Sequence, residues 1–147
     1  MGMSERLKNI TKEDWRMLGF YYDRDDFTKK WIFIGSKNGL EQFAINIEKY
    51  AINIKNSQIG EHDHIGPYSY LKIMTSDTFK ITKNSICGSL NNLLKLSEKI
   101  KEKIKESKEN DVFAIDSQFC EECEYSLEFS VKEYGYDPAL SDKQLWE

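Results

Sequence analysis

The chain has 147 residues, of which 39% are hydrophobic and 31% charged, with a net charge of −4. This length suits one domain of roughly 100–200 residues, and the composition excludes a disordered chain. No apolar run approaches the roughly 18 residues that cross a bilayer, and the first residues lack the apolar core of a secretion signal. We therefore expect a single domain over residues 1–147 that is cytoplasmic and does not bind membranes.

Charge is unevenly distributed along the chain. Residues 111–147 hold ten Asp or Glu residues against two Lys residues, whereas residues 83–110 hold seven Lys against four Glu. An acidic segment repels the phosphate backbone of nucleic acids and attracts basic proteins. The Lys-rich stretch 95–108 alternates with Glu, as a solvated helix face does. We predict that the protein binds no nucleic acid.

The first part of the chain predicts a hairpin of two strands. Residues 18–22 and 31–34 are aromatic or β-branched, and the polar cluster 23–26 between them suits a turn. A short helix around residues 11–17 would precede the first strand, because Thr11 can cap it and acidic residues follow in its first turn.

Further strands are predicted in the middle and near the end of the chain. Residues 68–74 and 79–86 form a second hairpin signal, and residues 112–115 and 125–131 form a closing pair. In the last of these segments apolar and polar side chains alternate, as in a sheet with one buried face. The tail that follows Asp137 is expected to be loosely attached.

Two amphipathic helices lie between these strand pairs and align at a constant offset of 53 residues. Gly35-Ser36-Lys37-Asn38-Gly39-Leu40 matches Gly88-Ser89-Leu90-Asn91-Asn92-Leu93, and the apolar positions that follow also correspond. We predict ββα units at about 17–56 and 68–108, with closing strands at about 111–133. The expected fold class is α+β, with a largely antiparallel sheet of about six strands, in the order ββα-ββα-ββ, and two helices on one face.

Few motifs in the chain have residues that could bind a metal or catalyse a reaction. His62-Asp63-His64 would place both imidazoles on one side of an extended chain, and Cys120-x-x-Cys123 has the spacing of a zinc knuckle or a redox pair. A zinc site from these residues would need two distant loops to meet. The Gly-Ser helix starts are interpreted as caps, and no nucleophile accompanies the histidines. We predict no catalytic residue, metal ligand or cofactor, and we expect the three cysteines to be reduced.

A series of motifs from both halves points to a family. The Gly-Ser helix start is followed by His-x-His-x-Gly-Pro-Tyr-x-Tyr-Leu-Lys over residues 62–72, a second Gly-Ser-Leu helix and a closing Leu-x-Phe-x-Val strand. Over about residues 18–135 this series resembles the small α+β immunity proteins of bacterial polymorphic toxin systems. The resemblance implies a bacterial protein that is not an enzyme and that neutralises a toxin by forming a stoichiometric complex.

An acidic and aromatic surface in the last quarter of the chain would suit a basic toxin domain, because charge complementarity and Tyr contacts are typical of interfaces. The predicted partner-binding residues are Glu121, Glu122, Glu124, Glu128, Glu133, Tyr134, Tyr136 and Asp137. Two alternatives stay open. One is a zinc-binding enzyme or sensor that uses the histidine and cysteine pairs, and the other is a homodimeric structural module that pairs through a sheet face or edge.

Overall fold

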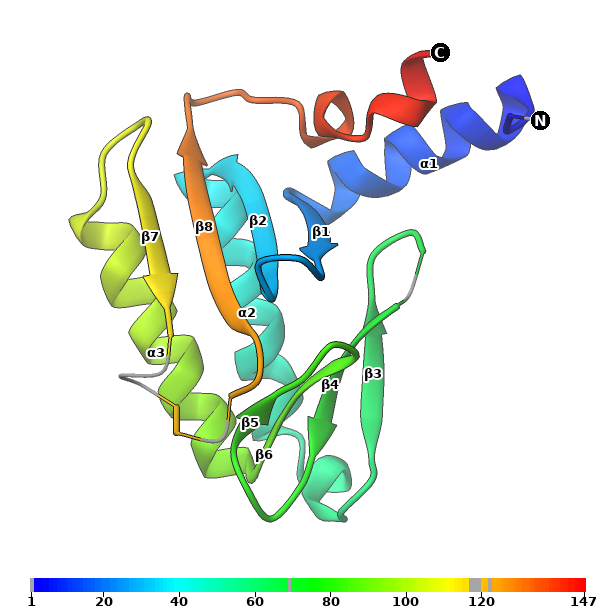
Figure 1. Ribbon diagram of the computed structural model, residues 1–147. Helices are drawn as coiled ribbons and strands as arrows, with labels where there is room; N and C mark the ends of the chain where they lie inside the picture. Colours follow the sequence, from blue (N-terminus) through cyan, green and yellow to red (C-terminus); the bar gives the residue numbers. More distant parts are fainter. Residues whose placement is uncertain (1, 69, 117–119, 122) are drawn as a thin grey trace.

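The computed structural model describes residues 2–68, 70–116, 120–121 and 123–147, and these form an α+β fold (Figure 1). The helices and strands are α1 (Glu5–Leu18), β1 (Tyr21–Asp25), β2 (Lys30–Ser36), α2 (Lys37–Ile52), β3 (His62–Ile65), β4 (Leu71–Thr75), β5 (Lys80–Ile81), β6 (Ser85–Gly88), α3 (Leu90–Glu106), β7 (Val112–Ile115) and β8 (Ser126–Lys132). The 3₁₀ helices are η1 (Ile54–Ser57), η2 (Pro138–Ser141) and η3 (Lys143–Trp146). Within these residues, no helix combines the length and apolar character that spanning a bilayer requires.

The described strands form two mixed four-stranded sheets, in the orders β1-β2-β8-β7 and β3-β4-β6-β5. In each sheet a central parallel pair is flanked by antiparallel pairs. The predicted single, largely antiparallel sheet of about six strands is therefore wrong. The ββα-ββα-ββ order is also not matched, because four strands separate α2 from α3. The prediction missed β3, whose flanking glycines and proline made residues 56–67 resemble a loop.

A different unit, ββαββ, occurs twice. β1β2α2β3β4 is followed by β5β6α3β7β8, and each unit contributes one hairpin to each sheet. Equivalent positions of α2 and α3 touch: Ser97 Oγ donates to the Ala44 carbonyl at 2.8 Å, and Lys101 pairs with Glu48 at 2.9 Å, each across 53 residues. The offset in the sequence thus reflects two helices that pack against each other at corresponding positions.

Serine side chains cap both of these helices, as predicted. Ser36 Oγ accepts from Gly39 N at 3.1 Å, and Ser89 Oγ accepts from Asn92 N at 3.0 Å. At the third position of the helix, α2 has Gly39 where α3 has Asn92. A Cβ on Gly39 would lie 1.9 Å from the Gly19 carbonyl oxygen. Only glycine therefore lets α2 approach the turn between α1 and β1 this closely.

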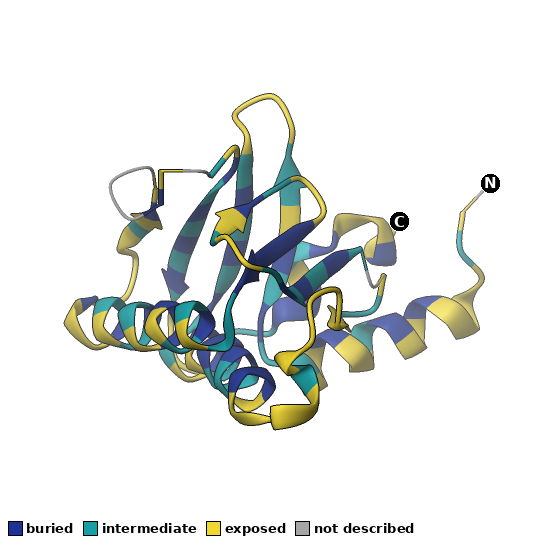
Figure 2. Ribbon diagram, turned by 90° about the horizontal axis from the view of Figure 1, so that it is seen from below, coloured by how far each residue is buried: buried dark blue, intermediate teal, exposed yellow. Residues whose placement is uncertain are grey.

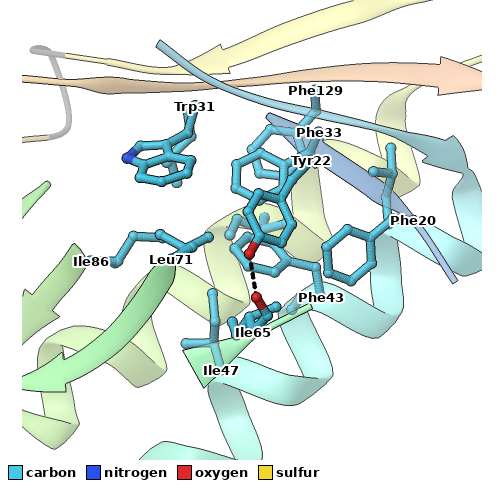
Figure 3. Close-up of a cluster of buried hydrophobic side chains, with 14 of the residues drawn as sticks. Phe20, Tyr22, Trp31, Phe33, Phe43, Ile47, Ile65, Leu71, Ile86 and Phe129 are labelled. Atoms are coloured by element: carbon cyan, nitrogen blue, oxygen red, sulfur yellow. Dashed lines mark hydrogen bonds between the residues drawn. The ribbon is translucent and has the colours of Figure 1, made fainter. Parts of the chain in front are cut away.

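The core lies between the sheets and these two helices. Phe33 stacks on Phe43 of α2 and on Phe129 of β8, with ring centroids 4.3 and 4.9 Å apart (Figure 3). The Tyr22 hydroxyl donates to the Ile65 carbonyl, so it links β1 of one sheet to β3 of the other (Figure 3). Buried residues from both sheets therefore join one hydrophobic cluster.

The C-terminal tail packs on α1, as Figure 1 shows. Trp15 Nε1 donates to Asp142 at 2.9 Å, and Arg16 pairs with Asp137 at 3.0 Å. Leu145 is 1% exposed. The expectation of a loosely attached tail is therefore wrong, because these long-range contacts hold the tail on α1. The sequence does not predict them, because the residues that make them form no periodic pattern.

Candidate partner-binding surface

The predicted partner-binding residues fall at opposite ends of β8. Glu121 and Glu124 precede the strand and are exposed, while Glu133 and Tyr134 follow it and are exposed as well. A strand of seven residues separates the two groups by about 20 Å, since a strand rises about 3.3 Å per residue. The structure therefore does not bring these residues into one contiguous surface.

Other predicted residues already have partners within the fold. Glu128 lies inside β8 and pairs with Lys30 of β2 at 3.0 Å. Tyr136 and Ser141 are joined through their hydroxyl groups, and Asp137 is held by Arg16. Glu122 lies outside the described residues. The exposed members of the predicted set are thus those nearest the two ends of β8.

The β1–β2 turn is an ordered acidic feature that the sequence prediction did not count as part of the surface. Asp25 Oδ1 accepts from the backbone N–H groups of Phe27 and Thr28 at 3.0 and 3.2 Å. Lys29 adopts a left-handed conformation with φ of 56° at the end of the turn, where the chain direction has reversed between β1 and β2. The Phe27 side chain is 98% exposed. A large apolar side chain is therefore presented to solvent on a turn that the neighbouring carboxylate stabilises.

This turn touches the acidic segment that precedes β8. The Tyr125 hydroxyl donates to Asp26 at 2.6 Å across 99 residues, and Ser126 N donates to the Lys29 carbonyl at 3.1 Å. Glu124, the neighbour of Tyr125, is exposed. We call Asp25, Asp26, Phe27 and Glu124 the acidic tip. It combines charges from two segments that lie far apart in the sequence.

Both aspartates of the acidic tip are held in their ionised form. Hydrogen bonds from Thr28 lower the pKa of Asp25 below its usual value. Hydrogen bonds from the Tyr125 hydroxyl and from Arg24 lower the pKa of Asp26. Arg24 Nε lies 2.6 Å from Asp26, and its Nη1 also donates to the Lys83 carbonyl at 2.7 Å. The tip therefore carries fixed negative charge at neutral pH, partly balanced by Arg24.

A sequence signal for the tip is the run of acids that directly precedes a phenylalanine at residues 23–27. Such a run is typical of a hairpin turn, and the sequence alone predicts no more than that turn. Its contact with Tyr125 depends on the parallel pairing of β2 with β8, and local patterns do not predict that pairing.

The candidate metal ligands remain separated. His62 and His64 are exposed on β3, an edge strand, and their rings lie 5.2 Å apart at 86°. Cys120 lies against the Phe79 carbonyl, which directly precedes β5 at the opposite edge of the same sheet. Among the described residues there is no group of three or more His, Cys, Asp or Glu side chains that could hold a metal ion.

Cys120 and Cys123 are joined by a disulfide, so the expectation that they are reduced is wrong for this pair. The short loop brings their Cα atoms to 5.4 Å, which is within the usual range for a disulfide. Cys87 is a free, buried cysteine. The disulfide closes the short loop that holds Glu121, and this loop directly precedes Glu124 of the acidic tip in the sequence.

Comparison of the chain with protein-family models, with curated proteins and with solved structures finds no significant match.

Proposed function

We propose that this protein is an immunity protein that neutralises a basic toxin by stoichiometric binding, and that the acidic tip contacts the toxin. The observation that carries the proposal is Phe27, which is 98% exposed and directly follows the ionised Asp25 and Asp26. The resemblance of residues 18–135 to the immunity proteins of polymorphic toxin systems supports the choice of a toxin as partner. This role involves binding without turnover.

Phe27 would supply the apolar part of the binding energy. Burying a phenylalanine side chain contributes about 1.5–3 kcal/mol relative to leaving it exposed. Because hydrogen bonds to Asp25 already order the turn, little conformational entropy is lost when a partner covers it. An aromatic side chain on a preorganised turn is a typical interface hot spot.

The carboxylates would act on the rate of association and on the choice of partner. Asp26 and Glu124 come from different segments, and Tyr125 connects them, because its hydroxyl donates to Asp26 and Glu124 is its neighbour in the sequence. Charged groups at an interface rim accelerate encounter with a partner of opposite charge, and salt screens this effect. The proposed complex should therefore form more slowly as ionic strength rises.

The first experiment is affinity capture of the tagged protein from its native cells at low salt, followed by calorimetry with the captured partner. We expect a basic polypeptide in a 1:1 complex whose toxic activity is lost on binding. Phe27→Ala should weaken the complex by about 10- to 100-fold. Tyr134→Ala is the matched control, because this aromatic residue is 84% exposed at the far end of β8.

Charge reversal tests the acidic part of the surface separately. Replacement of Glu121, Glu122 and Glu124 by Lys should weaken binding and reduce its dependence on salt. If affinity for the partner were unchanged by both this variant and Phe27→Ala, the tip would not be the contact surface. A partner that keeps its activity when bound would contradict the immunity function itself.

A further inference from the structure

α1 carries an exposed apolar stripe that the fold does not cover. Leu7 and Ile10 are each 48% exposed, and Met17 is 83% exposed. The buried side of the same helix is formed by Lys8, Thr11 and Trp15, which face the body and the C-terminal tail. Figure 2 shows the exposed residues along this helix, next to the chain end marked N.

The stripe has the spacing of a helix–helix contact. Leu7, Ile10, Asp14 and Met17 follow one another at intervals of three, four and three residues, which places them on one side of the helix. Asp14 is the one charged member of this series. A partner for the stripe must therefore offer apolar side chains and a positive charge at a matching position.

A second copy of α1 that lies antiparallel to the first offers an apolar side chain and a positive charge at matching positions. Arg6 and Asp14 are both exposed and lie four residues before and four residues after Ile10. Across the part of the chain that is described, neither of them forms an ion pair, whereas the nearby Arg16 pairs with Glu13 and Asp137. If a second α1 lies antiparallel and crosses at Ile10, each Arg6 lies opposite the other copy's Asp14.

We propose that two copies of this chain form a homodimer through α1, with a two-fold axis at Ile10. The two isoleucines meet at the axis, and two symmetric Arg6–Asp14 ion pairs flank them, as an isologous interface requires. A helix of 14 residues is about 21 Å long, at 1.5 Å per residue. The contact is therefore small, and the dimer is in rapid, concentration-dependent exchange with the monomer.

This interface is independent of the proposed immunity function. The stripe lies on α1, whereas the acidic tip lies beyond the opposite end of β1. It also differs from pairing through a sheet, because α1 takes part in neither sheet. A dimer could therefore present two acidic tips at once.

A charge-swap series measured by sedimentation equilibrium tests the proposal. Wild-type protein should show a mass that rises toward that of a dimer as concentration increases. Arg6→Asp and Asp14→Arg should each weaken dimerisation about tenfold or more, because each variant creates two like-charge contacts. The double variant Arg6→Asp with Asp14→Arg should restore the wild-type value within a few-fold. Circular dichroism would show that each variant, changed only at exposed positions, remains folded.

Cross-linking tests the position of the axis. Ile10→Cys should form an interchain disulfide under mild oxidation, because the two residues oppose each other. Asn9→Cys, at an exposed neighbouring position on another side of the helix, should not. Wild-type protein that stays monomeric at all concentrations would overturn the proposal, as would a dimer that the single charge variants and Ile10→Glu leave intact.

Discussion

Asp26 in the acidic tip and Asp142 in the C-terminal tail each accept a hydrogen bond from a tyrosine hydroxyl. Tyr125 donates to Asp26 at 2.6 Å, and Tyr68 donates to Asp142 at 2.5 Å. The two carboxylates differ in burial, since Asp142 is 4% exposed whereas Asp26 is exposed. Burial thus decides which of two similar contacts stabilises the fold and which leaves its charge available to a partner.

The acidic residues in the last quarter of the chain fall into two groups, those with contacts inside the fold and those that are exposed. Asp137 and Asp142 attach the tail to Arg16 and Trp15 of α1. Glu121 and Glu124 are exposed, and Glu124 directly precedes Tyr125, which contacts the β1–β2 turn. An excess of acidic residues in a sequence segment therefore does not define one surface, because some of these residues are used for internal contacts.

Removal of the Asp142 carboxylate should cause the largest change in stability. Asp142→Ala leaves the fully buried Trp15 Nε1 without its acceptor and removes the acceptor of Tyr68. We expect the free energy of unfolding to fall by about 2–3 kcal/mol, as measured by urea denaturation.

Asp142→Asn is the matched control for this prediction. The asparagine keeps an oxygen acceptor of the same shape, so it should lose less stability than the alanine variant. Equal stability of Asp142→Ala and wild-type protein would show that the tail is not held in the way described.

Residue patterns predicted only part of this arrangement. Capping serines, apolar helix faces and the alternating strand β8 follow from local chemistry, and the structure contains all three. The tail was missed because its single buried residues, such as Leu145, repeat with no helical or strand period. The parallel pairing of β2 with β8 joins the two central strands of a sheet, which lie far apart in the sequence, and no local signal specifies it.

The next prediction concerns the pH dependence of stability that Asp137 in the tail causes. Its effect on the free energy of unfolding should be smaller than that of Asp142→Ala. The hydrogen bond from Arg16 lowers the pKa of Asp137, so its ionised form is favoured in the folded state. This contribution to stability is present above the unfolded pKa of about 4 and is lost as pH falls through the folded value. We expect Asp137→Asn to unfold at a lower urea concentration than wild type at pH 7, and the difference should shrink below pH 4. A difference that persists undiminished at low pH would contradict a role for the ionised carboxylate.

The smallest expected effect on stability is that of Asp26→Asn in the tip. Its amide oxygen can still accept from Tyr125, and the side chain is exposed, so loss of the charged contact with Arg24 should lower the midpoint of urea unfolding by less than Asp137→Asn does. Association with the proposed toxin should nevertheless slow, and it should depend less on salt, since one steering charge is lost. Stopped-flow mixing at low and at physiological ionic strength measures both quantities. Glu133→Gln removes the same charge at the far end of β8 and should leave the rate unchanged, so equal slowing by both variants would mean that only net charge, and not the tip, guides the partner.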